Sequence, residues 1–146
     1  MDYAKEMAKA GFDVIIGSHP HMVQPIEWLE TTRADGSTGR TLVAYSLGNF
    51  VSAQRDQYKD TGIILDFTIR QEIATGDITI EDVGYVPVWV WRYEDGDKNA
   101  YRVLPCGAAL DALPEGMSDA DQARLSEAWS ETLELMTADG ITALKK

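Results

Sequence analysis

The spacing of apolar residues predicts a helix at the start of the chain, followed by a short strand. In residues 1–10, Tyr3, Met7 and Ala10 recur at spacings of four and three, which places them on one helical face that ends at Gly11. The next run, FDVIIG at 12–17, is apolar and β-branched, and it predicts a short buried strand. This order indicates one helix–strand step of an α/β unit.

Residues 23–105 have the pattern of β-strands joined by hairpins. VQPIEWLETT (23–32) and a strand over 41–46 flank the turn signals of RADGSTG, and Pro25 restricts the first of them to a sheet edge or places the proline at a strand start. A second hairpin joins 61–72 to 78–94 through ATGD. Residues 85–91 are apolar on both faces, which predicts a strand buried on both sides, and 101–105 predict a last strand.

The C-terminal part has the pattern of a helix over 118–136 and then a frayed tail, ADGITALKK. Ser118 is a good N-cap, and acidic residues follow it in the first turn, where the helix dipole favours them. The expected apolar stripe consists of Leu125, Trp129, Leu133 and Met136. The fold class is therefore α+β, β-rich with hairpins and a C-terminal helix.

Composition excludes several function classes. The net charge is −11, from 24 acidic and 13 basic residues, which argues against nucleic-acid binding or an anionic membrane surface. An acidic protein still handles anionic groups when metal ions lie between them. Cys106 is the single cysteine, so no intrachain disulfide forms, and the sequence contains no signal peptide and no apolar run long enough for a membrane span.

The only two histidines, His19 and His21, flank Pro20 directly after the first predicted strand. Residues two apart in an extended segment point the same way, and ligands in open α/β sheets gather where strands end. Imidazole is a common ligand of zinc, manganese and iron, so a metal site is one interpretation; a polar turn is the other. The further candidate ligands nearby, none at a diagnostic spacing, are Asp13, Gln24, Glu27 and Asn49.

Two stretches carry a resemblance to a known family. DVIIGSHPHMVQPIE followed by VAYSLGNFVSAQ resembles the C-terminal portion of the bacterial capsule-synthesis family of poly-gamma-glutamate, CapA-type proteins, which are similar to calcineurin-like metallophosphoesterases. TGIILDFTI, YVPVWVWRY and YRVLP extend the resemblance over roughly residues 1–106. It implies the C-terminal half of a layered α/β sandwich, with 107–146 as a linker and a C-terminal helix packing on the same domain.

By this resemblance, His19 and His21 each ligate one ion of a centre with two divalent metals, Mn, Zn or Fe. Gln24 lies in the second shell or contacts substrate, and Glu27 makes a structural hydrogen bond. Asn49 orients a ligand or substrate, or merely builds a turn with Gly48. Two metals suit phosphoester hydrolysis because they stabilise attacking and leaving oxygens and activate water.

The family's N-terminal Asp, Asn and His ligands are not in this sequence. We therefore expect this chain to be a piece of a longer protein, which is anchored in the membrane and faces the exterior of a bacterium. The longer protein would work with a membrane-bound synthesis complex, and its substrate would be an anionic polymer or a phosphoester. Alone, the chain should bind metal weakly and be inactive, and an exposed sheet edge would favour a homodimer. The alternatives are a non-catalytic scaffold of polymer synthesis or export and, more weakly, a metal sensor.

The remaining candidates have plainer interpretations. Asp66 alternates with apolar neighbours, which places it on a solvent face rather than in a catalytic site. Cys106 is expected to be a small buried hydrophobe rather than a reactive thiol. The aromatic residues of the strands favour packing over a polymer groove; they are Trp28, Tyr85, Trp89, Trp91 and Tyr93.

Overall fold

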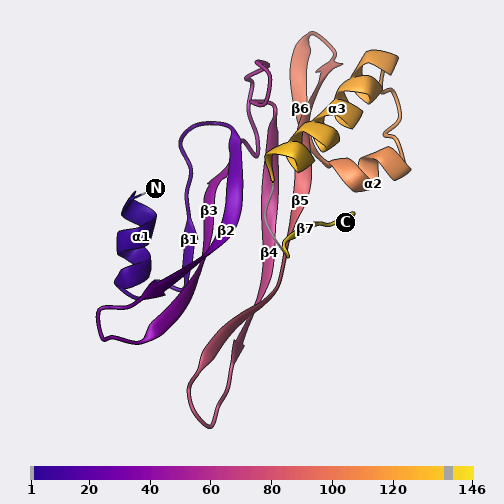
Figure 1. Cartoon of the computed structure of the whole chain (residues 1–146). Coiled ribbons are helices and arrows are strands. Elements are labelled where there is room, and N and C mark those ends of the chain that lie inside the picture. The colour runs from indigo at the N-terminus through magenta and orange to yellow at the C-terminus, as the bar shows by residue number, and fades with distance from the viewer. Residues whose placement is uncertain (1, 137–139) are drawn as a thin grey trace.

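The computed structural model describes residues 2–136 and 140–146, and it contains two mixed sheets with helices beside them. Figure 1 shows α1 next to the first sheet and α2 and α3 next to the second. In chain order the elements are α1 (Asp2–Lys9), β1 (Val14–Ile16), β2 (Val23–Thr32), β3 (Thr38–Leu47), β4 (Thr61–Gln71), β5 (Ile78–Asp95), β6 (Lys98–Pro105), α2 (Cys106–Asp111), α3 (Asp119–Leu135) and β7 (Thr142–Ala143).

The first sheet has the strand order β1–β3–β2. The expected hairpin is confirmed as β2 and β3, antiparallel from Val23↔Leu47 to Thr32↔Thr38, and Pro25 lies on the edge strand as predicted. β1 pairs parallel to β3 through Val14↔Leu42 to Ile16↔Ala44. The prediction of a buried strand here was wrong: β1 is an edge strand, and Ile16 is 55% exposed.

The second sheet is built on β5, which pairs with β4 along one edge and with β6 and β7 along the other. Residues 84–91 of β5 are all buried, which confirms the strand expected to be covered on both faces. The far end of the β4–β5 hairpin extends beyond the rest of the molecule (Figure 1). At its turn Ile73 is 96% exposed.

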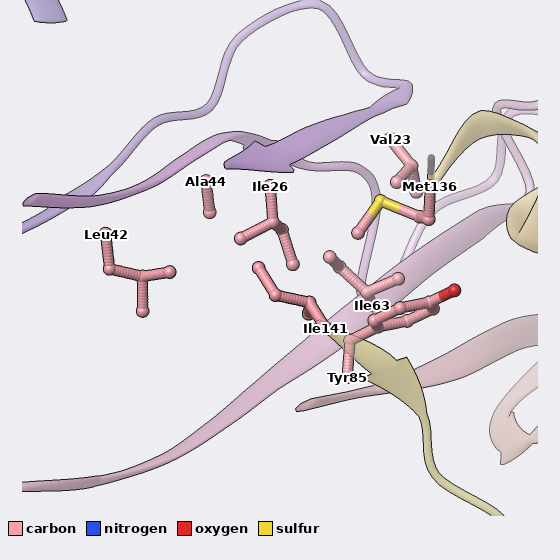
Figure 2. Close-up of a cluster of buried hydrophobic side chains, with 8 residues drawn as sticks. All are labelled: Val23, Ile26, Leu42, Ala44, Ile63, Tyr85, Met136 and Ile141. Atoms are coloured by element: carbon pink, nitrogen blue, oxygen red, sulfur yellow. The ribbon is translucent and has the colours of Figure 1, made fainter. Parts of the chain in front are cut away.

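The two sheets meet where β3 leads to β4. Gly48 and Gly62 form an isolated antiparallel bridge, and the Asn49 N–H donates to the Thr61 carbonyl at 3.1 Å. Gly48 has φ +71°, and a Cβ at either glycine would clash with backbone atoms of the other strand, so both positions require glycine. Around this junction lies the first core cluster, whose buried members are shown in Figure 2: Val23, Ile26, Leu42, Ala44, Ile63, Tyr85, Met136 and Ile141.

The second core cluster lies between β5, β6 and the two C-terminal helices, and it includes Trp89, Trp91, Cys106 and Leu125. α2 occupies part of the segment that the sequence predicted to be a linker. Its N-cap position is Pro105, which has no side-chain cap bond, so no capping signal marked its start.

α3 confirms the predicted C-terminal helix, and the Ser118 side chain accepts from the Asp121 N–H at 3.2 Å as its cap. Its buried face, however, is Leu125, Ala128, Thr132 and Met136. The predicted stripe was wrong at Leu133, which is 37% exposed.

The tail was also mispredicted over its described residues, 140–146. Ile141 is buried, β7 pairs with β5, and the Leu144 N–H donates to the Tyr85 carbonyl at 2.8 Å. Residues 138 and 139 of the predicted tail lie outside the described residues. The α+β class is confirmed, and no helix in the described residues is long and apolar enough to cross a membrane.

Candidate functional site

The candidate site forms where two loops leave neighbouring parallel strands. Residues 17–22, the histidine loop, follow β1, and residues 48–60, the asparagine loop, follow β3. Because β1 and β3 are parallel, their carboxyl ends lie at the same edge of the sheet. Here His21 Nδ1 lies 3.0 Å from Asn49 Oδ1, which joins the two loops across 28 residues of sequence.

The histidine loop is bent, not extended as the sequence analysis assumed. His19 has φ +120° and His21 has φ +59°, both in the region that non-glycine residues rarely adopt. Such conformations cost of the order of 1–3 kcal/mol each and tend to collect at functional sites. Both imidazoles are exposed, so they are accessible to a ligand.

Gly17 sets the entry of this loop. Its N–H donates to the Ala44 carbonyl at 2.7 Å, which extends the β1–β3 pairing by one residue. A Cβ at this position would clash with the Tyr45 carbonyl oxygen. The close approach of the two backbones therefore requires glycine immediately before the histidine motif.

Asn49 is held on all sides. Its Nδ2 donates to Lys59 O at 2.8 Å and to Gln54 Oε1 at 2.9 Å, while its Oδ1 faces His21. Asn49 therefore contacts the His21 ring in addition to forming part of the turn with Gly48. Sequence reasoning did not find Gln54, because it lies in a polar loop with no periodicity or spacing to mark it.

The end of the asparagine loop is anchored by a buried carboxylate. Asp60, 5% exposed, accepts from Trp89 Nε1 at 2.8 Å and from Arg124 Nη2 and Nε at 2.7 and 3.1 Å. Arg124 also donates to Glu131 at 2.8 Å. The hydrogen bonds to Asp60 raise the pKa of the Arg124 guanidinium above its ordinary value, so the guanidinium remains charged.

Gln24 and Glu27 lie further along β2, three residues apart. Gln24 is exposed and pairs in register with Ser46. Glu27 accepts from the Tyr45 hydroxyl at 2.5 Å. Burial, and then this bond, raise the pKa of Tyr45 to about 12. The structure thus brings Asn49, but not Glu27, to a histidine.

The two imidazole side chains are of a type that divalent transition metals bind, since zinc, manganese and iron all accept imidazole nitrogen as a ligand. In number it is incomplete: within the described residues, no group of three or more His, Cys, Asp or Glu side chains is placed to hold an ion. A catalytic zinc usually has three protein ligands. His19 and His21 therefore fit as part of a metal site and not as a whole one. Asp13, another candidate ligand, is paired with Arg33 at 2.5 Å.

The other candidates are structural. Tyr85, Trp89 and Trp91 are buried in the cores, and Tyr93 stacks on Trp91 with ring centroids 4.8 Å apart, which agrees with packing. Cys106 is fully buried, as predicted. Asp66, 42% exposed, pairs with Lys146.

Comparison with known proteins supports the resemblance over the segment that carries this site. Residues 1–54 match the family described as "Bacterial capsule synthesis protein PGA_cap". The chain is also similar to the PGA biosynthesis protein CapA of Bacillus subtilis (strain 168), with 43% identity over 51 residues, 35% of this chain. The matched part is 11% of the length of that relative. No solved structure matches the chain. The resemblance of residues beyond 54 to the same family, and the metallophosphoesterase-like sandwich, remain predictions.

Proposed function

We propose that this chain, whose residues 1–54 carry the sequence of the bacterial capsule-synthesis family, supplies the His-x-His motif of a metal-dependent hydrolase site of the phosphoesterase type. His19 and His21 would each hold one divalent ion, Mn, Zn or Fe. The ions, when bound, would stabilise the attacking and leaving oxygens of an ester and lower the pKa of a water. The rest of the ligands would come from other parts of a longer protein.

The observation that carries the proposal is the position of the histidine loop. It lies at the carboxyl ends of two parallel strands, it has strained backbone at both histidines, and His21 is bonded to Asn49 from the neighbouring loop. Strained backbone of this kind tends to collect at functional sites, and here it occurs at two residues of one exposed loop, on either side of Pro20. Gln24, exposed on β2 and paired with Ser46, would contact the ligands or the substrate.

The substrate class we propose is an anionic capsule polymer or a phosphoester. The net charge of −11 makes direct electrostatic binding of a polyanion unfavourable, so positively charged metal ions would have to lie between protein and substrate. The relative is named for PGA biosynthesis, which makes poly-gamma-glutamate the first polymer to test. The fold alone does not fix the reaction. We further propose that the whole protein acts at the outer side of the membrane.

Metal binding by this chain is the direct test. Isothermal titration with Zn²⁺ and with Mn²⁺ should show weak binding to the chain, because only two of the usual three or more ligands are present. The double variant His19→Ala, His21→Ala should show none. This variant is a clean control because the sequence has no other histidine.

The whole protein provides the second arm of the experiment. Elemental analysis should find about two metal ions per chain, as expected for a two-metal hydrolase, and the same double variant should lose them. Retention of all bound metal in the variant would refute a role for this motif. Absence of bound metal in the whole protein would favour the alternative, a non-catalytic scaffold in polymer synthesis or export.

A further inference from the structure

We infer that Asn49 is a positioning residue that keeps the proton of the neutral His21 ring on Nδ1 and leaves the lone pair on Nε2. The inference concerns the protonated atom of the ring and stands on hydrogen-bond geometry. Its consequence for a metal, that His21 binds through Nε2, rests on the proposed function.

The first step is the orientation of the Asn49 amide. The Lys59 carbonyl oxygen, 2.8 Å away, can only accept a hydrogen bond, so the amide nitrogen must face it. The second hydrogen of that nitrogen goes to Gln54 Oε1 at 2.9 Å. The amide oxygen is therefore the atom that faces the imidazole, and a flipped amide would place two acceptors against each other.

The second step is the ring itself. Asn49 Oδ1 lies 3.0 Å from His21 Nδ1 and, as an amide oxygen, it accepts only. His21 Nδ1 must therefore donate. In a neutral imidazole one nitrogen carries hydrogen and the other a lone pair, so Nε2 becomes the basic, ligand-binding atom. A hydrogen bond of this kind to the distal nitrogen is how proteins orient histidine ligands.

The third step is the rigidity of the support. The Asn49 N–H is bound to Thr61 O, and Lys59 is followed by the buried Asp60, which is held by Trp89 and Arg124. Within the same loop, Arg55 donates to Val90 O at 2.7 Å. The asparagine loop is thus attached to β5 and α3 at several points. The acceptor for His21 is preorganised rather than recruited when a ligand arrives.

His19 provides an internal comparison. Its side chain is exposed, and no acceptor among the described residues is placed against its ring as Asn49 is against that of His21. The two histidines of this loop are therefore expected to differ in which ring nitrogen carries the proton, and one ¹H–¹⁵N correlation spectrum reports this for both.

The test is long-range ¹H–¹⁵N correlation on the ¹⁵N-labelled chain, at a pH where both imidazoles are neutral. The expected result is a pyrrole-type shift at His21 Nδ1 and a pyridine-type shift at Nε2, with averaged shifts for both nitrogens of His19. Averaged shifts at His21, or a proton on Nε2, would overturn the inference. This result needs no variant.

Two variants attribute the effect to Asn49. Asn49→Ala should give averaged shifts at His21, whereas Gln54→Met, which leaves the Asn49 amide held by the Lys59 carbonyl, should preserve the Nδ1–H form. An Nδ1–H signal unchanged in the alanine variant would contradict a positioning role. The backbone amide spectrum of each variant shows whether it has folded.

Addition of Zn²⁺ to the labelled chain separates this inference from the proposed function. Binding should shift His21 Nε2 while Nδ1 keeps its proton. No shift with an intact Nδ1–H signal would argue against the metal site and leave the positioning inference in place. Loss of the Nδ1 proton on addition of zinc would show that His21 binds through Nδ1, which would refute this consequence of the inference and support metal binding.

Discussion

Burial determines the chemistry of several single side chains in this molecule. Cys106, the first residue of α2, packs in the second core cluster and is fully inaccessible. Tyr45 is partly buried beside Glu27, on the strand that leads to the asparagine loop. Both groups are neutral when protonated, so burial disfavours their ionised forms and raises both pKa values.

Cys106 should be unreactive in the folded chain. Burial raises the pKa of its thiol from 9.0 to about 12, which lowers the fraction of thiolate at pH 8 roughly a thousandfold. Reaction with a disulfide reagent should therefore be slow in buffer and complete quickly in guanidinium chloride. Rapid reaction without denaturant would mean that α2 does not cover this residue.

Tyr45 should make stability fall between pH 10 and 12. Its pKa rises from 10.0 when unfolded to about 12 when folded, so its contribution is complete below pH 10 and is lost as pH rises toward 12. Tyr85 and Cys106, whose pKa values are also raised, add to this fall. In urea unfolding, Tyr45→Phe should flatten the fall in part, whereas a change at the exposed Tyr3 should not. An unaltered slope in Tyr45→Phe would contradict the assignment.

At the scale of elements, α3 is attached to the second sheet by a small-residue face and by one charged group. Ala128 and Thr132 are buried on that face, and Arg124 reaches from the helix to Asp60. The same contact anchors the asparagine loop. A helix near the C-terminus therefore supports a site made from strands near the N-terminus.

Loss of this contact should be costly. Arg124→Met leaves the Asp60 carboxylate buried without its counter-ion, which typically destabilises a protein by about 3–5 kcal/mol. The matched control is Arg70→Met, which breaks an exposed pair with Glu81 and should change the stability little. Urea unfolding of both variants measures the difference. Equal losses would show that the buried pair has no special role.

The elements that sequence could predict are those with local signals. The bounds of β2 follow from the loop and turn residues on either side of it, and the cap of α3 follows from Ser118. α2 is six residues without a capping side chain, and β7 is two residues, so neither has a pattern long enough to detect. The stripe of α3 was misassigned at Leu133 because tertiary packing selected small residues for the close approach.

The candidate site was predictable to a smaller extent. The two histidines were singled out by their spacing after a predicted strand, and Asn49 as a nearby candidate. Their roles came from a resemblance, and only the pairing of β1 with β3 brings the two loops together. Gln54, Asp60 and Arg124 became visible only in three dimensions, because each acts on a partner chosen by folding rather than by sequence spacing. A buried polar group has no periodic signature.

At the scale of the whole molecule, β5 connects the two core clusters. Tyr85 belongs to the first cluster, while Trp89 and Trp91, a few residues later on the same strand, belong to the second. Met136, at the C-cap of α3, reaches the first cluster as well. Because both clusters include residues of β5, unfolding of this strand in one cluster should also destabilise the other.

Unfolding should therefore be a single transition. Three of the four tryptophans, Trp89, Trp91 and Trp129, lie in or against the second cluster, so fluorescence reports mainly on it, and circular dichroism reports on the whole chain. The urea midpoints from the two methods should coincide. As a check, Ile26→Ala in the first cluster should lower both midpoints together, with a loss of about 2–5 kcal/mol. A shift in one signal alone would show two independent units.

The turn that joins β4 to β5 should tolerate changes of sequence and length during evolution. Residues 72–77 lie at the end of an arm that extends past both cores, and the whole turn is exposed. Substitutions and insertions there change no buried contact, so selection for folding hardly restrains them. The bridge between Gly48 and Gly62 is the opposite case, since a side chain at either position would clash with neighbouring backbone atoms. Relatives of this chain should therefore vary in length at the arm and keep both glycines at the junction, even where overall identity is low.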